Sequence, residues 1–217
     1  MSKIVNYNMA SRTRVAQFVT GRDLTADDKE TLEQVREMAH MRQADLERQE
    51  VDWGLTVPDA LEHLLSGRAD SPAEWAGNAY YTALQHVIDY SGSDISTLAS
   101  YSSPITLYSV LDKELGAAGV EPGLLPTQYI FSGPPSEIPF HIPRPPEGSP
   151  EIGVWPMQKA GPAIQAYREA LDRIDPDLRY ELSELIEALD GWYSGWHRNR
   201  DMPWWREDTS IFFSVAG

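Results

Sequence analysis

The 217-residue chain contains no cysteine, and no uninterrupted apolar run long enough to cross a bilayer. Disulfides and thiolate chemistry are therefore excluded, which fits a reducing compartment. A membrane-spanning helix needs about 18 or more consecutive apolar residues, so none is expected. The first residues, MSKIVNYNMASRTR, show no apolar signal core. These absences together predict a cytoplasmic protein.

Positive charge is also scarce, with 18 Lys and Arg against 33 Asp and Glu and a formal net charge of −15. An acidic chain repels phosphate backbones and anionic lipid, so nucleic-acid and membrane-surface binding are disfavoured. The same charge suits a basic protein partner, although it also serves solubility alone.

Catalytic signatures are missing as well. The sequence contains no nucleophile elbow, HExxH pair, phosphate-binding loop or dinucleotide-binding glycine pattern. None of the five histidines is spaced with another as a helical metal pair: His40, His63, His86, His141 and His197. We therefore expect no metal and no cofactor.

What the sequence does contain predicts an α+β fold, namely a helix-rich single domain over residues 1–217. Capping residues and helical spacing indicate helices within 11–21, 24–50, 56–67, 71–92, 103–119, 161–174 and 175–200. The 71–92 helix begins with a capping-box pattern, Ser71 and Glu74. Its polar arc is narrow (Glu74, Asn78, Thr82, Gln85 and Asp89), so we expect it to be the most buried helix.

A small sheet is predicted from the two chain ends and the 127–155 region. Residues 3–11 and the terminal TSIFFSVAG have β-type composition, and TQYIFSG, IPFHIPR and EIGVWP are candidate short strands. Residues 121–162 hold 11 of the 16 prolines, which excludes long helices there. We interpret 120–160 as an ordered Pro-rich excursion or lid.

His86 is the candidate catalytic residue. It lies at the edge of the apolar face of the 71–92 helix, beside aromatic positions, where an imidazole could titrate near neutrality as an acid or base. The alternative is a core-edge histidine bonded to a carbonyl. A pocket between this helix and the Pro-rich excursion would be lined by Tyr80, Tyr81, His86, Trp155 and Trp205. Asp59 and His63, four residues apart, could orient a general base or form a solvated surface pair.

The stretch GWYSGWHRNRDMPWW, residues 191–205, concentrates aromatic and basic residues. Steps of four and three from Leu178 to Trp196 predict a buried helix seam. Gly191 and Gly195 would either admit another backbone or break the helix. After Pro203, an exposed tryptophan beside a cation could anchor a partner or an aromatic ligand, so the candidate binding residues here are His197, Trp204, Trp205 and Arg206.

Several stretches together resemble the YfbM-like family of small bacterial proteins: MSKIVNYNMAS, DWGLTVPDALEHLLSG, EWAGNAYYTALQHVI, and ELIEALDGWYSGW followed by DTSIFFSVAG. The resemblance covers about half of the chain. It implies an α+β domain, and relatives that resemble immunity proteins suggest binding of a toxin. It carries over no active-site residue, because GNAYY replaces an expected Gly-Pro-Arg element and the Pro-rich segment has no counterpart.

Two functions follow from these observations. The first is an acidic cytoplasmic binding protein, such as an immunity-type protein that neutralises a toxin. The alternative is a small-molecule enzyme, a hydrolase or cyclase of specialised metabolism, with an aromatic-lined pocket. The predicted partner is accordingly a basic protein or a small aromatic molecule. Oligomeric state does not follow from the sequence.

Overall fold

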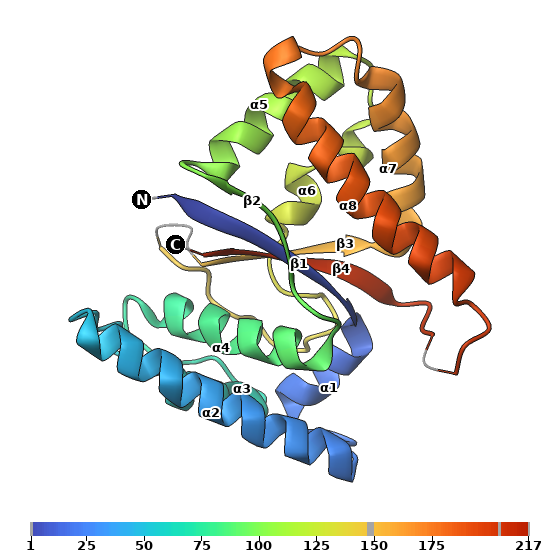
Figure 1. The fold of residues 1–217 in the computed structure, drawn as a ribbon. Helices are drawn as coiled ribbons and strands as arrows, with labels where there is room; N and C mark the ends of the chain where they lie inside the picture. Colours follow the sequence, from blue (N-terminus) through green and yellow to red (C-terminus); the bar gives the residue numbers. More distant parts are fainter. Residues whose placement is uncertain (1, 147–149, 204, 217) are drawn as a thin grey trace.

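The computed structural model describes residues 2–146, 150–203 and 205–216. A twisted sheet lies in the middle, with one helical layer on each of its faces (Figure 1). Helices α1 to α4 cover one face and α5 to α8 the other, so the described chain has two hydrophobic cores separated by the sheet. The predicted α+β class is confirmed.

Four described strands form the antiparallel sheet, in the order β2-β1-β4-β3. They are β1 (Lys3–Ser11), β2 (Ser96–Tyr101), β3 (Glu151–Pro156) and β4 (Thr209–Ala216). The two chain ends pair along their whole length, from Ile4 opposite Ala216 to Ser11 opposite Thr209, as predicted. Strand β2 was not predicted, because STLASY is mostly small and polar and contains only Thr97 and Tyr101 of the residue types that are enriched in strands.

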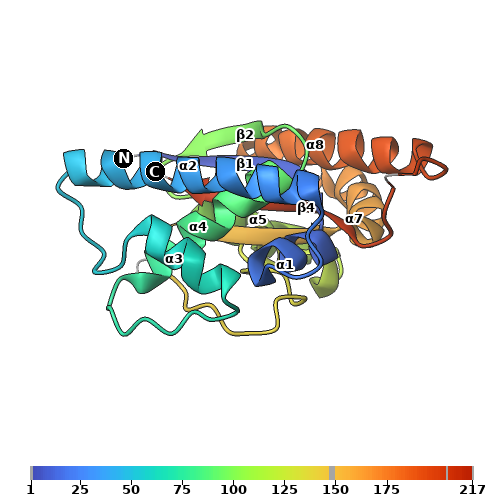
Figure 2. The ribbon, with the colours of Figure 1, turned by 90° about the horizontal axis from the view of Figure 1, so that it is seen from below.

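The layer below the sheet in Figure 1, here called the lower layer, is seen from underneath in Figure 2. It consists of α1 (Arg12–Thr20), α2 (Ala26–Arg48), α3 (Val57–Leu65) and α4 (Ala76–Ser91). The predicted caps Ser11, Thr25 and Thr56 each accept a hydrogen bond from the first turn of their helix. The predicted capping box of α4 is wrong, since that helix begins at Ala76, beyond both of its residues. The backbone N–H of Ser71 instead donates to the Tyr80 hydroxyl at 3.1 Å.

The upper layer consists of α5 (Pro104–Ala117), α6 (Thr127–Ile130), α7 (Met157–Ala170) and α8 (Arg179–Arg198), with short 3-10 turns at Pro122–Leu124 and Pro176–Leu178. The predicted seam of α8 is confirmed at Leu182, Leu185, Leu189 and Trp196, which are buried. Trp192 is only partly buried, and Leu178, also partly buried, lies just before the helix. The helix runs on through Gly191 and Gly195, and a Cβ added at either would meet no described atom within 4 Å. Both interpretations of these glycines, close approach and a helix break, were therefore wrong.

The described part of the Pro-rich segment is packed into the fold. Ile130, Phe131, Ile138 and Ile142 are buried, and the N–H of Gly133 donates to Ile152 O at 2.8 Å. Two of the predicted strands are wrong, because TQYIFSG contains α6 and IPFHIPR forms no regular structure; EIGVWP is β3. Whether the segment also moves as a lid stays a prediction.

Candidate functional site

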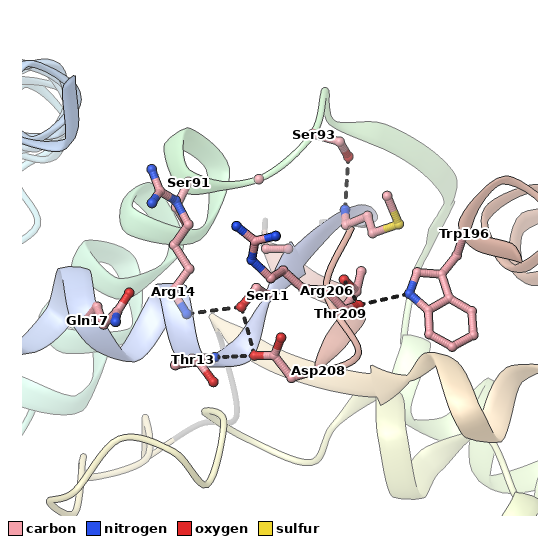
Figure 3. A pocket seen from close by; sticks show the side chains of 13 residues that line it. Ser11, Thr13, Arg14, Gln17, Ser91, Ser93, Trp196, Arg206, Asp208 and Thr209 are labelled. Carbon is pink, nitrogen blue, oxygen red and sulfur yellow. Dashed lines mark hydrogen bonds between the residues drawn. The ribbon is translucent and has the colours of Figure 1, made fainter. Parts of the chain in front are cut away.

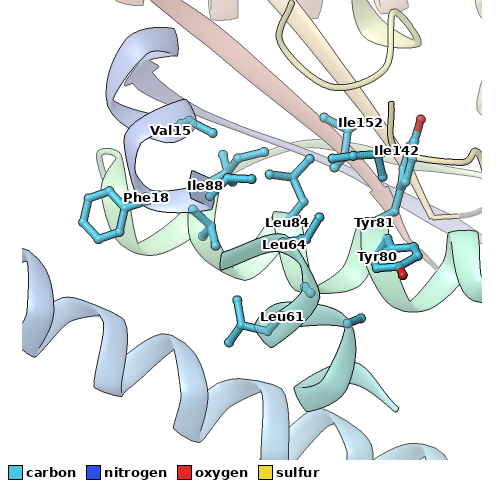
Figure 4. Packing of buried hydrophobic residues seen from close by; sticks show 14 of the residues in the cluster. Val15, Phe18, Leu61, Leu64, Tyr80, Tyr81, Leu84, Ile88, Ile142 and Ile152 are labelled. Carbon is cyan, nitrogen blue, oxygen red and sulfur yellow. The ribbon is translucent and has the colours of Figure 1, made fainter. Parts of the chain in front are cut away.

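The predicted aromatic pocket is not formed. Tyr80 and Tyr81 are both buried and point to opposite sides of α4 (Figure 4). The Tyr80 hydroxyl accepts from Ser71 N and lies 2.8 Å from His63 Nδ1, so His63 is neither paired with Asp59 nor part of a solvated pair. Burial raises the pKa of Tyr81 to about 12, opposed by the nearby Arg144 charge.

Trp155 also lies away from His86. Its side chain is fully buried in the upper core, where it stacks on Tyr129 with ring centroids 4.6 Å apart. Tyr80 and Tyr81 belong to the lower core, on the other face of the sheet. Strand alternation decides this outcome, because Ile152 and Val154 of β3 face the lower core while Trp155 faces the upper one.

The described C-terminal candidates do not line the same pocket as His86, and they contact the end of α8 and the turn that follows it. Trp205 is partly buried, stacks on Trp196 at 5.1 Å between ring centroids and donates from Nε1 to Trp196 O at 3.1 Å. His197 is exposed, with its ring edge against Tyr193. Trp204 lies outside the described residues. Arg206 is exposed and donates to the carbonyls of Pro203 and Trp205.

Arg206 contributes to an open cleft of about 850 Å³ between the start of α1, the loop after α4 and the end of α8, here called the C-terminal cleft (Figure 3). Its most obvious anion site is already filled by the chain itself. The Asp208 carboxylate accepts from the Ser11 hydroxyl and from Thr13 N, both at 2.7 Å. These donors at the α1 N-terminus lower the pKa of Asp208 against the opposing effect of burial. The donors that usually attract an anion to a helix start are thus used in holding β4 to α1.

His86 lines a second cleft, here called the His86 cleft, with a volume of about 630 Å³. It lies between the start of β1, the second half of α2 and the middle of α4. Its walls are formed by Lys3, Ile4, Asn6, Arg42, Leu46, Gln49, Val51, Trp53, Asn78, Thr82, Gln85, His86 and Pro150. A volume of this size is typical of small-molecule sites.

The His86 imidazole is neutral at physiological pH. Burial is the main cause, and the charge of Arg42 adds to it, so that the pKa of His86 falls to about 4. The expectation that it titrates near neutrality was therefore wrong. Its Nε2 is shielded from solvent and has no hydrogen-bond partner among the described residues.

Gln85, one residue earlier, is oriented by Asp89. The Gln85 Nε2 donates to Asp89 Oδ1 at 2.6 Å, and an ionised carboxylate can only accept, so the amide oxygen must face away from it. That oxygen, Oε1, is also shielded and lacks a partner within the described part of the chain. The wall of the His86 cleft therefore holds two polar atoms with unused hydrogen-bonding capacity.

The His86 cleft differs in charge from the rest of the acidic molecule. Its described lining includes the cations Lys3 and Arg42 and no carboxylate, although acids outnumber bases by 33 to 18 in the chain. Arg42 forms no ion pair with any described residue, whereas Lys3 lies close enough to Glu151 to oppose the burial that raises its pKa. The cleft thus offers net positive charge beside an apolar wall.

Opposite charge characterises a third hollow, the acidic groove, of about 460 Å³ between β2 and α8. It is lined by Glu184 and Glu187 together with Tyr7 and Trp192, whose rings meet edge to face at 6.5 Å between centroids. This groove suits a cationic group rather than an anion.

Asp89 provides a test of the electrostatics beside the His86 cleft. Burial raises its pKa from 3.8 to about 6, with the Gln85 hydrogen bond opposing it. Because the folded state holds this proton more tightly than the unfolded chain, the carboxyl's stabilising contribution is complete below its unfolded pKa and is lost as the pH rises through 6. Asp89→Asn should therefore raise the free energy of unfolding by about 3 kcal/mol at pH 7.5 and by about 1 kcal/mol at pH 4.5.

Urea unfolding of both proteins at the two pH values measures this difference. An equal gain at pH 4.5 and 7.5 would mean that the carboxyl is not held in its buried, proton-binding state. Asp190→Asn serves as the control, because the Asp190 side chain is 40% exposed and pairs with Arg168 at the surface, where an ion pair contributes little to stability.

The set of residues that line the His86 cleft could not be predicted from the sequence. His86 and the polar arc containing Thr82 and Gln85 were visible on one helix, but Lys3, Arg42 and Trp53 come from segments far apart in the chain. No local pattern marks these three, because their proximity depends on how α2 and α4 pack against each other below the sheet.

The described residues contain no group of three or more side chains suited to hold a metal ion. Nor does the described part of the chain include a helix long and apolar enough to cross a membrane. Residues 1–214 match the family model described as Domain of unknown function (DUF7691). No curated protein and no solved structure matches the chain. The match does not bear on the YfbM-like resemblance, which stays a prediction.

Proposed function

The chain belongs to the DUF7691 family, whose domain has no assigned function, and we propose that this member is a cytoplasmic protein that binds a small molecule in the His86 cleft. The proposal keeps the expectation of a binding protein and takes the small molecule, rather than a basic protein, as the partner.

One observation carries the proposal. His86 Nε2 and Gln85 Oε1 are buried without partners in the wall of a cleft of about 630 Å³. Leaving a buried polar group unsatisfied costs about 1–3 kcal/mol, so such atoms in a folded protein require an explanation. Both atoms are shielded from solvent, so a ligand reaches them only when neighbouring side chains of the wall move aside, and such a ligand offers one.

The protonation state of His86 favours a binding function over a catalytic one. A general base works best when its pKa lies near the operating pH, and the pKa of His86, about 4, is well below that range. A neutral imidazole is instead well suited to give one hydrogen bond and accept another. The hydrolase or cyclase alternative would need a ligand that restores the basicity of this ring.

A variant with a blocked cleft tests the proposal. Ile4 lines the cleft and is 45% exposed, so Ile4→Trp should fill the cleft with little effect on stability. A fragment collection is screened by ligand-observed NMR against both proteins. Fragments that bind the wild type should lose at least tenfold in affinity for Ile4→Trp. Fragments that bind both equally well would contradict the proposal.

An immunity-type function remains a second candidate because of the acidic groove. Glu184, Glu187 and Trp192 together form a surface that suits a lysine or arginine side chain of a basic protein. The blocked variant separates the two functions, since a protein bound at this groove would be unaffected by Ile4→Trp.

A further inference from the structure

The contents of the His86 cleft also indicate the chemistry of its ligand. We propose that this ligand is a small carboxylic acid with an apolar body, held at its carboxylate by Arg42 with the support of Lys3. This inference rests on the proposed function, since it specifies the molecule that the same cleft would bind.

The charge of the cleft favours an anionic ligand. Arg42 is partly buried and has no acidic partner among the described residues, in a chain with ample acid to supply one. A guanidinium donates two parallel hydrogen bonds to a carboxylate, which makes an unpaired arginine in a cleft a good carboxylate anchor. Its charge is already felt inside the cleft, where it lowers the pKa of His86.

Two effects disfavour an anion in the cleft, and both are weaker than the attraction of its cations. The cleft includes Gln49, the C-cap of α2, and a helix C-terminus carries roughly half a negative charge. That is outweighed by the full charge of Arg42, to which Lys3 adds although it also lies near Glu151. The net charge of −15 repels anions from afar, but charges beyond about 10 Å are largely screened at 0.1 M salt.

The polarity of the cleft wall favours a ligand with an apolar body. Leu46, Val51 and Trp53 give the cleft an apolar wall beside the cations, while Gln85 and the neutral His86 lie on the α4 side. A ligand with a charged end and an apolar body matches this division. A phosphate is less well served, because the described cleft lacks the helix N-terminal N–H groups that usually hold one.

The probes that test this inference are N-acetyl-L-phenylalanine and N-acetyl-L-phenylalaninamide. They share the ring, the amide N–H and nearly the same volume, and they differ in the negative charge. Binding is followed by chemical-shift titration of the intact protein. The acid should bind the cleft at least tenfold more tightly than the amide.

Arg42→Gln should weaken the acid about tenfold, leave the amide unchanged and unfold at the same temperature as the wild type. Arg48→Gln is the matched control on the same helix, because Arg48 is 78% exposed and does not line the cleft. Equal affinity of acid and amide, or an acid affinity unaffected by Arg42→Gln, would overturn the inference.

The two proposals fail in different ways. If the cleft binds other fragments but not the acid, the carboxylate inference is wrong and the small-molecule function stands. If no probe and no fragment perturbs the cleft residues, both are wrong.

Discussion

Gly153→Ala is expected to lower the free energy of unfolding by at least about 3 kcal/mol, the upper range for overpacking a core. Gly153 lies in β3, and a Cβ there would come within 2.2 Å of the carbonyl oxygens of both Tyr129 and Ile130. These are backbone atoms of α6 (Tyr129 and Ile130), so no side-chain rotation can make room. The whole α6 turn would have to move off the sheet.

Urea denaturation of the variant measures the loss. Gly191→Ala is the control, since a Cβ at that position meets no described atom within 4 Å and lies within α8. It should raise stability by about 1 kcal/mol through helix propensity. A Gly153→Ala protein as stable as the wild type would show that the Pro-rich segment is not packed on β3 as described.

Trp205→Ala is expected to cost about 3 kcal/mol of stability, at the low end for the loss of a packed tryptophan. The side chain stacks on Trp196, donates to Trp196 O and lies beneath the Arg200 guanidinium at 5.8 Å. Its removal would expose the end of the α8 seam. Ligand binding in the His86 cleft should be unchanged, because Trp205 does not line it.

Thermal unfolding measures the loss of stability, and a fragment titration of the same sample measures ligand binding in the His86 cleft. Trp205→Phe should recover part of the lost stability by restoring the stack without the Nε1 hydrogen bond. A Trp205→Ala protein of normal stability that loses a ligand would instead make this tryptophan a binding residue, as the sequence suggested.

Local signals predicted the fold well. The caps at Ser11, Thr25 and Thr56 and the seam ending at Trp196 depend on neighbouring residues, and all are confirmed. The pairing of the chain ends followed from their β-type composition. By contrast, β2 is mostly small and polar, and α6 is a single turn in a stretch whose aromatic and β-branched residues favoured a strand.

Of the residues predicted to line a pocket with His86, only His86 itself lines the cleft that the structure contains. His86 does line a cleft, but Tyr80 turns toward α3, where it meets His63, and Trp155 turns toward the upper core. Helix rotation and strand alternation decide these directions, and a sequence fixes neither without knowing which partner covers each face. The same limit explains why Arg42 could not be paired with His86 in advance.

The most direct test of the central claim is a backbone amide map of ligand binding. Spectra of the ¹⁵N-labelled protein are recorded while fragments of the collection are added, and the shifted residues are placed on the structure. We expect shifts that cluster at Lys3–Asn6, around Arg42 and Trp53, and along α4 from Asn78 to His86. Shifts that cluster instead around Ser11, Ser93 and Arg206, in the larger C-terminal cleft, would contradict the account.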